Sequence, residues 1–353
     1  LNEAQPAWPA DWLDELDHLL LAHAQAGTDT RLQALPALDR GHGPAGPQAG
    51  QQVGPWQLLE RLGEGGMASV WRARRADGAY EREVALKLPH ALPWRDDLAQ
   101  RLARERDILA RLDHPHIARL YDAGLAEGGQ PWLALEIVAG QRIDQWADRQ
   151  RLDVPARLRL ALQAVRAVAH ADAQLVVHRD LKPSNLQVDA GGQVKLLDFG
   201  IAKLLDAEAD RHGDGGGEAA ELTEQGARPM TPGYASPEQV AGGPVGTRSD
   251  VYSLGVLLYE LLAGVSPYGA ALASRTDLEA AVLRAQPRRP SEAAADPGRR
   301  KALRGDLDTI VLHALAKRPE DRYATADALA DDIERHLAHR PLQARPDGRW
   351  QAL

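Results

Sequence analysis

The stretch from Val177 to Gly200 constrains this 353-residue chain more than any other part of it. It reads Val-His-Arg-Asp-Leu-Lys-Pro-Ser-Asn-Leu-Gln-Val-Asp-Ala-Gly-Gly-Gln-Val-Lys-Leu-Leu-Asp-Phe-Gly. Residues 188–194 predict a hairpin turn between two short strands. Such a turn would fold Asn185 and Asp198 back side by side. An amide oxygen and a carboxylate are ligands that Mg²⁺ accepts, so one metal cluster could touch both.

A second informative stretch begins at Trp56, where the pattern changes to strands. A Gly-rich turn, Gly63-Glu-Gly-Gly-Met-Ala-Ser-Val70, lies between two of them. Glycines let backbone N–H groups approach phosphates closely, which favours a nucleotide site. No helix is predicted directly after the turn, and this argues against a Rossmann dinucleotide site.

Lys87 lies on a further predicted strand, Glu83-Val-Ala-Leu-Lys-Leu, where a buried ammonium needs a carboxylate partner. Residues 96–112 predict a helix with one leucine-rich face, and Glu105 falls on that face. A charge inside an apolar stripe is unfavourable unless it is paired. Lys87 is the partner we expect; a solvated edge position for Glu105 is the alternative.

Taken in order, these motifs resemble the signatures of protein kinases. Residues 178–185 match H-R-D-x-K-x-x-N, residues 198–200 match D-F-G, and Val84-Ala-Leu-Lys87 matches V-A-I-K with one change. From about Trp56 to Arg340 the chain is similar to bacterial serine/threonine protein kinases of the eukaryotic type.

That resemblance implies an α+β, bilobal fold with a five-stranded antiparallel sheet and one helix in the N-lobe, and a mainly helical C-lobe. The expected divisions are an N-terminal amphipathic helical segment, a flexible Gly/Pro linker, the N-lobe, the C-lobe and a C-terminal tail, at residues 1–39, 40–55, 56–138, 139–340 and 341–353. The N-terminal helix could dock on the kinase domain or bind a regulatory partner, and the sequence does not separate these alternatives.

The resemblance also implies transfer of the γ-phosphate of ATP to Ser or Thr hydroxyls of proteins, with ATP and Mg²⁺ as cofactors. Asp180 would accept the hydroxyl proton, Lys182 would hold a γ-phosphate oxygen, and Thr231 would bridge the two. Lys87, braced by Glu105, would bind the α- and β-phosphates. Asn185 and Asp198 would hold the metal. The residues expected around the nucleotide are Leu62, Gly63, Glu64, Gly65, Gly66, Val70, Ala85, Lys87, Leu135, Glu136, Val138, Gln187 and Asp198.

Two positions depart from the family pattern. Ala68 replaces the third glycine of the Gly-rich loop, and Gln187 replaces the apolar residue expected under the adenine ring. We expect weaker adenine packing but not lost binding, because the aliphatic part of Gln187 can still cover the ring. These departures keep a pseudokinase that binds partners without turnover as the alternative. Lys182, Thr231 and Ser236-Pro-Glu238 disfavour a small-molecule phosphotransferase, since they serve a peptide site.

The segment after Gly200 carries the regulatory prediction. An acidic run from Asp206 to Glu221 precedes Thr223, which is the candidate phosphosite for autophosphorylation; an ordinary loop threonine is the alternative. Arg179 could pair with a phosphothreonine. Further along, Asp250 is expected to accept backbone N–H bonds from residues 178–185, here called the catalytic loop. Arg322 is expected to pair with Glu238.

Composition excludes several other classes. A net charge of −8 gives no footprint for nucleic acid or an acidic membrane surface. The absence of cysteine rules out disulfides and Cys-based metal sites. The longest apolar run, Val251–Leu262, is too short to span a bilayer and contains Glu260. We therefore expect a cytoplasmic fragment, with any membrane anchor beyond residue 353, acting on protein substrates and able to pair with a second copy for autophosphorylation in trans.

Overall fold

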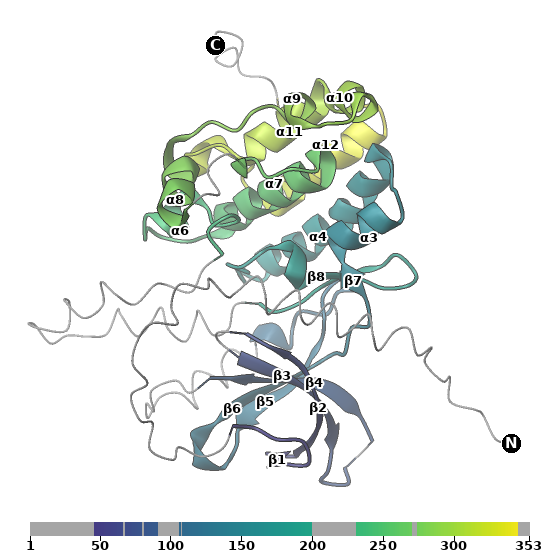
Figure 1. Ribbon diagram of the computed structural model, residues 1–353, viewed down its shortest axis with the longest axis vertical. Coiled ribbons are helices and arrows are strands. Elements are labelled where there is room, and N and C mark those ends of the chain that lie inside the picture. The colour runs from purple at the N-terminus through teal and green to yellow at the C-terminus, as the bar shows by residue number, and fades with distance from the viewer. Residues whose placement is uncertain are drawn as a thin grey trace, which may run out of the picture. The chain divides into compact units, whose positions relative to one another are not determined.

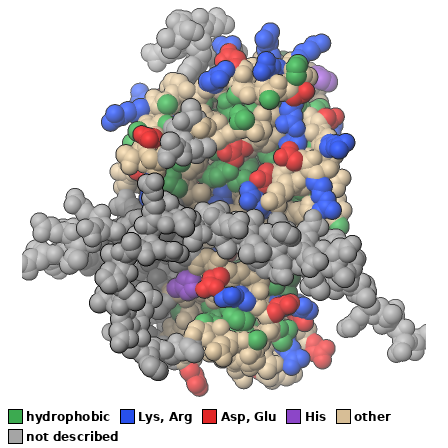
Figure 2. Space-filling view, in the orientation of Figure 1, with side chains coloured by type: hydrophobic (Ala, Val, Ile, Leu, Met, Phe, Trp, Pro, Cys, Tyr) green, Lys and Arg blue, Asp and Glu red, His purple; other side chains and the backbone are tan. Residues whose placement is uncertain are grey.

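The computed structural model describes residues 46–65, 68–79, 81–90, 106, 108–199, 231–269 and 274–344 (Figure 1). The chain divides into two compact units. The N-terminal unit comprises Leu1–Asp107 and Leu120–Ile137, and the C-terminal unit comprises Ile108–Arg119 and Val138–Leu353. Acidic and basic side chains are interspersed over much of the exposed surface (Figure 2).

A single antiparallel sheet forms the described part of the N-terminal unit. Its strand order is β1-β2-β3-β4-β6-β5, and a short 3₁₀ turn, η1 (Glu127–Gly129), joins β5 to β6. The strands are β1 (Gln52–Val53), β2 (Trp56–Glu64), β3 (Ala68–Arg75), β4 (Glu83–Pro89), β5 (Leu120–Leu125) and β6 (Pro131–Leu135).

The expected strand count of five is wrong, because the sheet has six strands in the described residues. The extra strand, β1, comes from the end of the segment that we assigned to a flexible linker. Val53 pairs with Trp56 and is only 4% exposed, so its burial draws the chain back onto β2. Gly54 makes this possible: its φ is +57°, and a Cβ there would lie 2.8 Å from the Trp132 Nε1 atom.

Alternation along the strands builds the core of this unit. In β4, Val84, Leu86 and Leu88 are buried, while Ala85 and Lys87 between them are half-buried on the opposite face. The buried face packs with three tryptophans, and the full cluster is Val53, Trp56, Leu58, Trp71, Ala73, Val84, Leu86, Leu88, Trp132 and Ala134. One face of the sheet therefore closes on a core, and the other remains available for a site.

The C-terminal unit is mainly helical and contains one small sheet of β7 (Gln141–Arg142), β8 (Leu186–Val188) and β9 (Val194–Leu196). Two short 3₁₀ turns also belong to this unit: η2 (Pro183–Asn185) directly precedes β8, and η5 (Pro319–Asp321) lies between α11 and α12. The helices are α3 (Ile143–Arg149), α4 (Val154–Ala173), α6 (Pro237–Val240), α7 (Thr247–Ala263), α8 (Arg275–Arg284), α9 (Pro290–Ala293), α10 (Pro297–Leu303), α11 (Asp306–Ala314) and α12 (Ala326–Leu337).

Helix α7 lies at the centre of this unit and packs against α4, α11 and α12 (Figure 1). It is buried along almost its whole length, as expected for a helix that is apolar on all sides. A Cβ at Gly255 would lie 2.9 Å from the Ala314 Cβ, so glycine is what lets α11 approach so closely. This packing fixes the N-terminal turn of α7, which carries Asp250 beneath the catalytic loop.

Several expectations lie outside the described residues: the N-terminal helical segment, Gly66, Glu105, the acidic run, Thr223 and the chain beyond Ala344. Of the helix predicted over residues 96–112, Arg106, Ile108 and Leu109 are helical. Within the described ranges, no helix combines the length and apolarity that a bilayer crossing requires.

Candidate active site

The hairpin predicted after Asn185 is confirmed. Strands β8 and β9 pair antiparallel, with Leu186 opposite Leu196. The Leu197 backbone N–H donates to the Asn185 carbonyl oxygen at 2.8 Å, one residue before Asp198. The two segments that carry the predicted metal ligands are therefore joined directly at their ends.

Asp180, Lys182 and Thr231 form a connected polar group. The Lys182 Nζ lies 3.0 Å from the Asp180 Oδ2 and donates to the Thr231 Oγ1 at 3.1 Å. Both side chains of the ion pair are only about a quarter exposed or less, at 24% and 20%. The ammonium therefore holds a carboxylate and a hydroxyl from two distant parts of the chain in one place.

Asn185 is oriented from the same loop. Its Nδ2 donates to the Asp180 carbonyl oxygen at 2.8 Å and reaches the Asp180 Oδ2 at 3.4 Å. The amide oxygen accepts no hydrogen bond from the described part of the chain, so it can serve as a metal ligand. Asp198 holds a positive φ of +52°, which is strained for a residue other than glycine and common at functional sites.

This donor set fits a hard divalent cation. One amide oxygen and one carboxylate suffice for Mg²⁺, which keeps several waters and takes further ligands from substrate phosphates. Among the described residues, there is no group of three or more His, Cys, Asp or Glu side chains arranged to hold a metal by themselves.

His178 lies beneath this loop, fully buried. Its Nδ1 accepts a hydrogen bond from the Asp180 backbone N–H at 3.3 Å, and its Nε2 donates to the Leu197 carbonyl oxygen at 2.9 Å. One nitrogen accepts and the other donates, which requires a neutral imidazole. Burial lowers the pKa of His178, consistent with that state. The ring thus ties the loop of Asp180 to the strand that leads to Asp198.

Asp250 anchors the loop from below, as predicted. Its carboxylate accepts the His178 backbone N–H at 2.6 Å and the Arg179 backbone N–H at 3.0 Å. Arg179 has a φ of +67°, so these two bonds hold a conformation that the chain would not adopt by preference. Burial raises the pKa of Asp250, and the two N–H donors act against that rise.

Gln239 is a supporting residue that sequence reasoning missed. Its Nε2 donates to the Arg179 carbonyl oxygen at 3.0 Å, while its Oε1 accepts the Ser236 backbone N–H at 2.9 Å. Ser236 and Gln239 form the capping box of α6. The S-x-x-Q spacing is a known signal for such a cap and would have identified Gln239.

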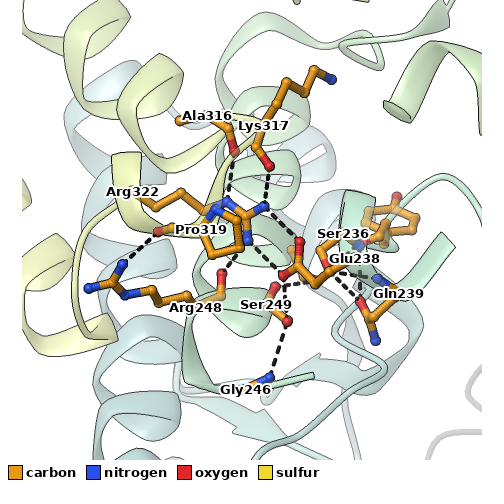
Figure 3. Close-up of polar contacts among 12 residues, drawn as sticks. Ser236, Glu238, Gln239, Gly246, Arg248, Ser249, Ala316, Lys317, Pro319 and Arg322 are labelled. Atoms are coloured by element: carbon orange, nitrogen blue, oxygen red, sulfur yellow. Dashed lines mark hydrogen bonds and ion pairs between the residues drawn. The ribbon is translucent and has the colours of Figure 1, made fainter. Parts of the chain in front are cut away.

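The predicted pairing of Glu238 with Arg322 is confirmed (Figure 3). Arg322 donates to both Glu238 oxygens at 2.8 Å, and its other N–H groups reach the carbonyl oxygens of Ala316, Arg248 and Lys317. All five donors of the guanidinium are satisfied.

Glu238 is equally well supported. It also accepts the Ser249 hydroxyl at 2.6 Å. Burial acts to raise the pKa of Glu238, but the hydrogen bonds from Arg322 and Ser249 outweigh it and hold the pKa below its ordinary value. Helix α6, which contains Glu238, is thereby fixed to α7 and to the loop before α12 (Figure 3).

In the N-terminal unit, four predicted nucleotide residues share one face of the sheet. Val70 pairs with Lys87, and Ala85 pairs with Leu135. Directly paired residues of neighbouring strands place their side chains on the same side. All four are half-buried, opposite the tryptophan core. The register therefore brings these four side chains together on one surface.

The Gly-rich turn closes between β2 and β3. Gly63 pairs with Val70 and Glu64 with Ser69, and the Gly65 backbone N–H donates to the Ala68 carbonyl oxygen at 2.9 Å. A register shift at Leu62 marks a local irregularity in β2. The His90 Nε2 contacts the Gly65 carbonyl oxygen at 2.8 Å, a contact that no sequence signal indicated.

Three further residues predicted to contact the nucleotide lie in the described part of the chain. Glu136 and Val138 are half-buried and belong to the segment where the chain passes from one unit to the other. Gln187 occupies the middle of β8 and is half-buried, while its neighbours Leu186 and Val188 are fully buried on the other face. This alternation agrees with the orientation expected from the sequence.

Comparison with known proteins decides the family. The model of the protein kinase domain matches residues 56–333. The chain belongs to the protein kinase family. The resemblance to bacterial serine/threonine kinases of the eukaryotic type, and the α+β kinase fold that it implied, are confirmed.

Individual relatives agree with this assignment. The serine/threonine-protein kinase pkn3 of Myxococcus xanthus is 39% identical over 213 residues, covering 59% of this chain and 37% of that protein. The tyrosine-protein kinase MasK of Myxococcus xanthus is 36% identical over 307 residues, covering 82% of this chain and 44% of that protein. The chain thus spans less than half the length of both relatives.

A solved structure shares the fold. The kinase domain of PknI from M. tuberculosis has a TM-score of 0.60 and 26% sequence identity, over 83% of this chain and 99% of that one.

Proposed function

We propose that this chain is an ATP-dependent protein kinase that phosphorylates Ser and Thr hydroxyls. The observation that carries the proposal is the hydrogen-bonded group of Asp180, Lys182 and Thr231 beside the joined segments of Asn185 and Asp198. Phosphoryl transfer needs positioned charge more than a covalent catalyst, and this group supplies it.

In this proposal Asp180 accepts the proton of the substrate hydroxyl as its oxygen attacks the γ-phosphorus, and the bond from phosphorus to the oxygen of ADP breaks. Lys182 stabilises charge on a γ-phosphate oxygen. Mg²⁺, when bound by Asn185 and Asp198, neutralises charge on the phosphates. The neutral ring of His178 and the carboxylate of Asp250 keep Asp180 in position, because each binds the loop backbone.

The N-terminal unit would supply the nucleotide contacts. Lys87, with Glu105 as its expected partner, would hold the α- and β-phosphates, and the backbone of Gly63–Gly66 would cover them. Val70, Ala85 and Leu135 would pack on the adenine from the face of the sheet that they share.

The remaining nucleotide contacts complete this proposal. Glu136 and Val138 would bind the adenine edge through their backbone. Gln187 would cover the ring with its aliphatic part.

Serine/threonine specificity is favoured over tyrosine specificity by Thr231. Its hydroxyl is bonded to Lys182, and that lysine is bonded to Asp180, so the threonine lies beside the proposed base. The name of MasK motivates a direct test of tyrosine, because that relative covers most of this chain.

Mg²⁺ as the metal, a cytoplasmic location, autophosphorylation at Thr223 and pairing of two copies are further parts of the proposal. The oxygen donors of Asn185 and Asp198 support the choice of Mg²⁺. Thr223 is the candidate for autophosphorylation because it stands only eight residues before Thr231.

The test is to incubate the chain with γ-labelled ATP and Mg²⁺ beside an Asp180→Ala variant. Label on protein serine or threonine that the variant does not incorporate supports the kinase. Nucleotide binding with no label in either protein would favour a pseudokinase. Label on tyrosine alone would reject the proposed specificity, and acid hydrolysis followed by phosphoamino-acid separation distinguishes these products.

A further inference from the structure

Helices α9 and α10 carry a basic surface that the proposed chemistry does not use. Residues 288–304 contain six basic and two acidic residues, although the whole chain has a net charge of −8. The basic residues, here called the α9–α10 face, are Arg288, Arg289, Arg299, Arg300, Lys301 and Arg304. Helix α10 packs against α9, so these charges are carried by neighbouring elements. Lys and Arg side chains are frequent along the rim of the C-terminal unit where Figure 1 labels α9 and α10 (Figure 2).

The acidic residues around this face balance only part of its charge: Asp148 and Asp153 line a cavity together with Arg299. Asp296 is used as the N-cap of α10, where its Oδ1 accepts the Arg299 backbone N–H at 2.7 Å. Glu292 lies 4.0 Å from Arg289, the outer limit for an ion pair. Within residues 288–304 the six basic residues still outnumber the two acidic ones, so the face favours an anionic partner.

Two of the cations are fully available. Lys301 and Arg304 are exposed and make no hydrogen bond or ion pair with any other described residue. Arg300 differs, because its Nε donates to the Ala294 carbonyl oxygen at 2.6 Å and so joins α10 to the end of α9. The arrangement fixes the surface while leaving its outermost charges free to bind.

The sequence contains a matching anionic segment. Asp206–Glu221 has six acidic residues and one arginine, and it ends two residues before Thr223. A fully extended segment of this length could span about 50 Å.

We propose that the α9–α10 face is a docking surface for Asp206–Glu221 of a second copy of this chain, which holds Thr223 of that copy near the active site. This inference rests on the proposed kinase function. Two chains of net charge −8 repel each other at long range, so an encounter between copies needs a local region of opposite charge. The α9–α10 face supplies it.

The experiment uses an inactive substrate copy, Asp180→Ala, and measures label transferred to it by an active copy. The active copy is either the natural sequence or Lys301→Glu/Arg304→Glu. We expect the charge-reversed enzyme to show roughly a fivefold to tenfold higher KM for the substrate copy, since exposed ion pairs contribute modestly. A matched control, Arg159→Glu/Arg340→Glu, makes the same change in charge at exposed positions elsewhere and should leave KM unchanged.

A second substrate copy makes the test specific to the acidic segment. Its acids at positions 206, 208, 210, 214, 218 and 221 are replaced by the corresponding amides. Toward this copy the natural and charge-reversed enzymes should have equal KM values, because the interaction has already been removed. A persisting difference would overturn the proposal. Equal KM values toward the unaltered substrate copy would also overturn it.

Two further measurements separate this inference from its alternatives. A short Ser/Thr peptide without acidic residues should be phosphorylated equally by all the active enzymes; label on no substrate at all would reject the kinase function. In that case, fluorescence anisotropy of a labelled 206–221 peptide still tests docking, and binding unaffected by Lys301→Glu/Arg304→Glu would reject it. If Lys301→Glu/Arg304→Glu abolished binding of the enzyme to phosphatidylserine vesicles but left phosphate transfer to the substrate copy unchanged, the face would bind lipid instead.

Discussion

Two regions of the C-terminal unit treat charge in opposite ways. Around the N-terminal turn of α7, buried charges have full sets of partners: Arg322 uses all five donors, and Asp250 accepts two backbone N–H groups. On the face between α4 and α12, the charge with the most partners is instead an exposed one. Arg166 is 31% exposed and contacts Asp327, Asp331 and Glu334.

The same α4–α12 face contains a poorly bonded buried acid. Asp172 is 8% exposed, and its Oδ2 accepts a single long bond of 3.4 Å from the Ala326 backbone N–H. Its Oδ1 has no hydrogen-bond partner among the described residues. The number of ion pairs is therefore a poor guide to stability; the burial of each charge and the completeness of its bonds decide the effect.

The largest effect is expected at Asp180, whose role is chemical. Asp180→Asn should lower kcat by about 10²- to 10⁴-fold, because the amide cannot accept the substrate proton. The melting temperature should change little, since the side chain is not part of the buried support. Steady-state kinetics and thermal unfolding measure the two effects. Asp113→Asn, which alters an exposed acid paired with Arg119, should leave kcat unchanged; an equal loss in both variants would refute the assignment.

Arg322→Met should cost about 3–5 kcal/mol of unfolding free energy, because it leaves Glu238 buried without its charged partner. Arg166→Met provides the matched comparison and should cost about 1 kcal/mol or less, since its ion pairs are exposed. Urea denaturation of the two variants measures both values. Similar losses would mean that burial does not separate the two regions.

Asp172→Asn should stabilise the protein at alkaline pH. Burial, together with the nearby Asp250 carboxylate, raises the pKa of Asp172 to about 7. The folded state then keeps a proton that the unfolded chain releases, so the stability that Asp172 contributes falls as pH rises from about 4 to about 7. The variant should gain on the order of 1–3 kcal/mol at pH 8 and nothing near pH 4.

Asp332 offers the control for that pH series. It is fully buried, but it accepts hydrogen bonds from the Tyr323 hydroxyl and from the backbone N–H groups of Gln343 and Ala344. Asp332→Asn should therefore destabilise the protein, because an amide cannot accept all three of these bonds. Chemical denaturation at pH 4, 6 and 8 checks both variants; a destabilised Asp172→Asn at pH 8 would contradict the prediction.

The smallest effect is expected at Leu175, which follows α4 with a φ of +60° and is 88% exposed. A positive φ costs a residue with a Cβ about 1–2 kcal/mol, while glycine costs about 0.5–1 kcal/mol in chain entropy. The strain outweighs the entropy, so Leu175→Gly should stabilise by about 0.5 kcal/mol. Leu175→Ala keeps the strain and should give no gain. Thermal unfolding of both variants distinguishes the strain from the mere removal of an exposed leucine.

Much of the fold followed from local pattern. The Gly-Gly turn after Val188 predicted the β8–β9 hairpin. The pairing of Arg322 with Glu238 could also be predicted, because the family motif places both.

Other features had no local signal. The Gly-rich linker gave no indication of β1, since Val53 is buried in a cluster that includes residues of distant strands such as Trp132. Ile108–Arg119 belong with the C-terminal unit although they precede β5, because the backbone of Ala118 bonds to Leu196.

The sequence by itself determined the chemistry of the candidate site: an acid, an ammonium, an amide and a second acid at fixed spacing, with a glycine-rich turn far upstream. Spacing suffices there because the catalytic loop and the hairpin are local structures whose geometry follows from a few neighbouring residues. Only the tertiary structure decided which buried charges are satisfied, since the carboxylate that pairs with Arg322 and the N–H donors to Asp250 and Asp172 come from segments dozens of residues away. Hydrogen bonding acts over a few ångströms of space, and distance along the chain does not reveal which groups will meet.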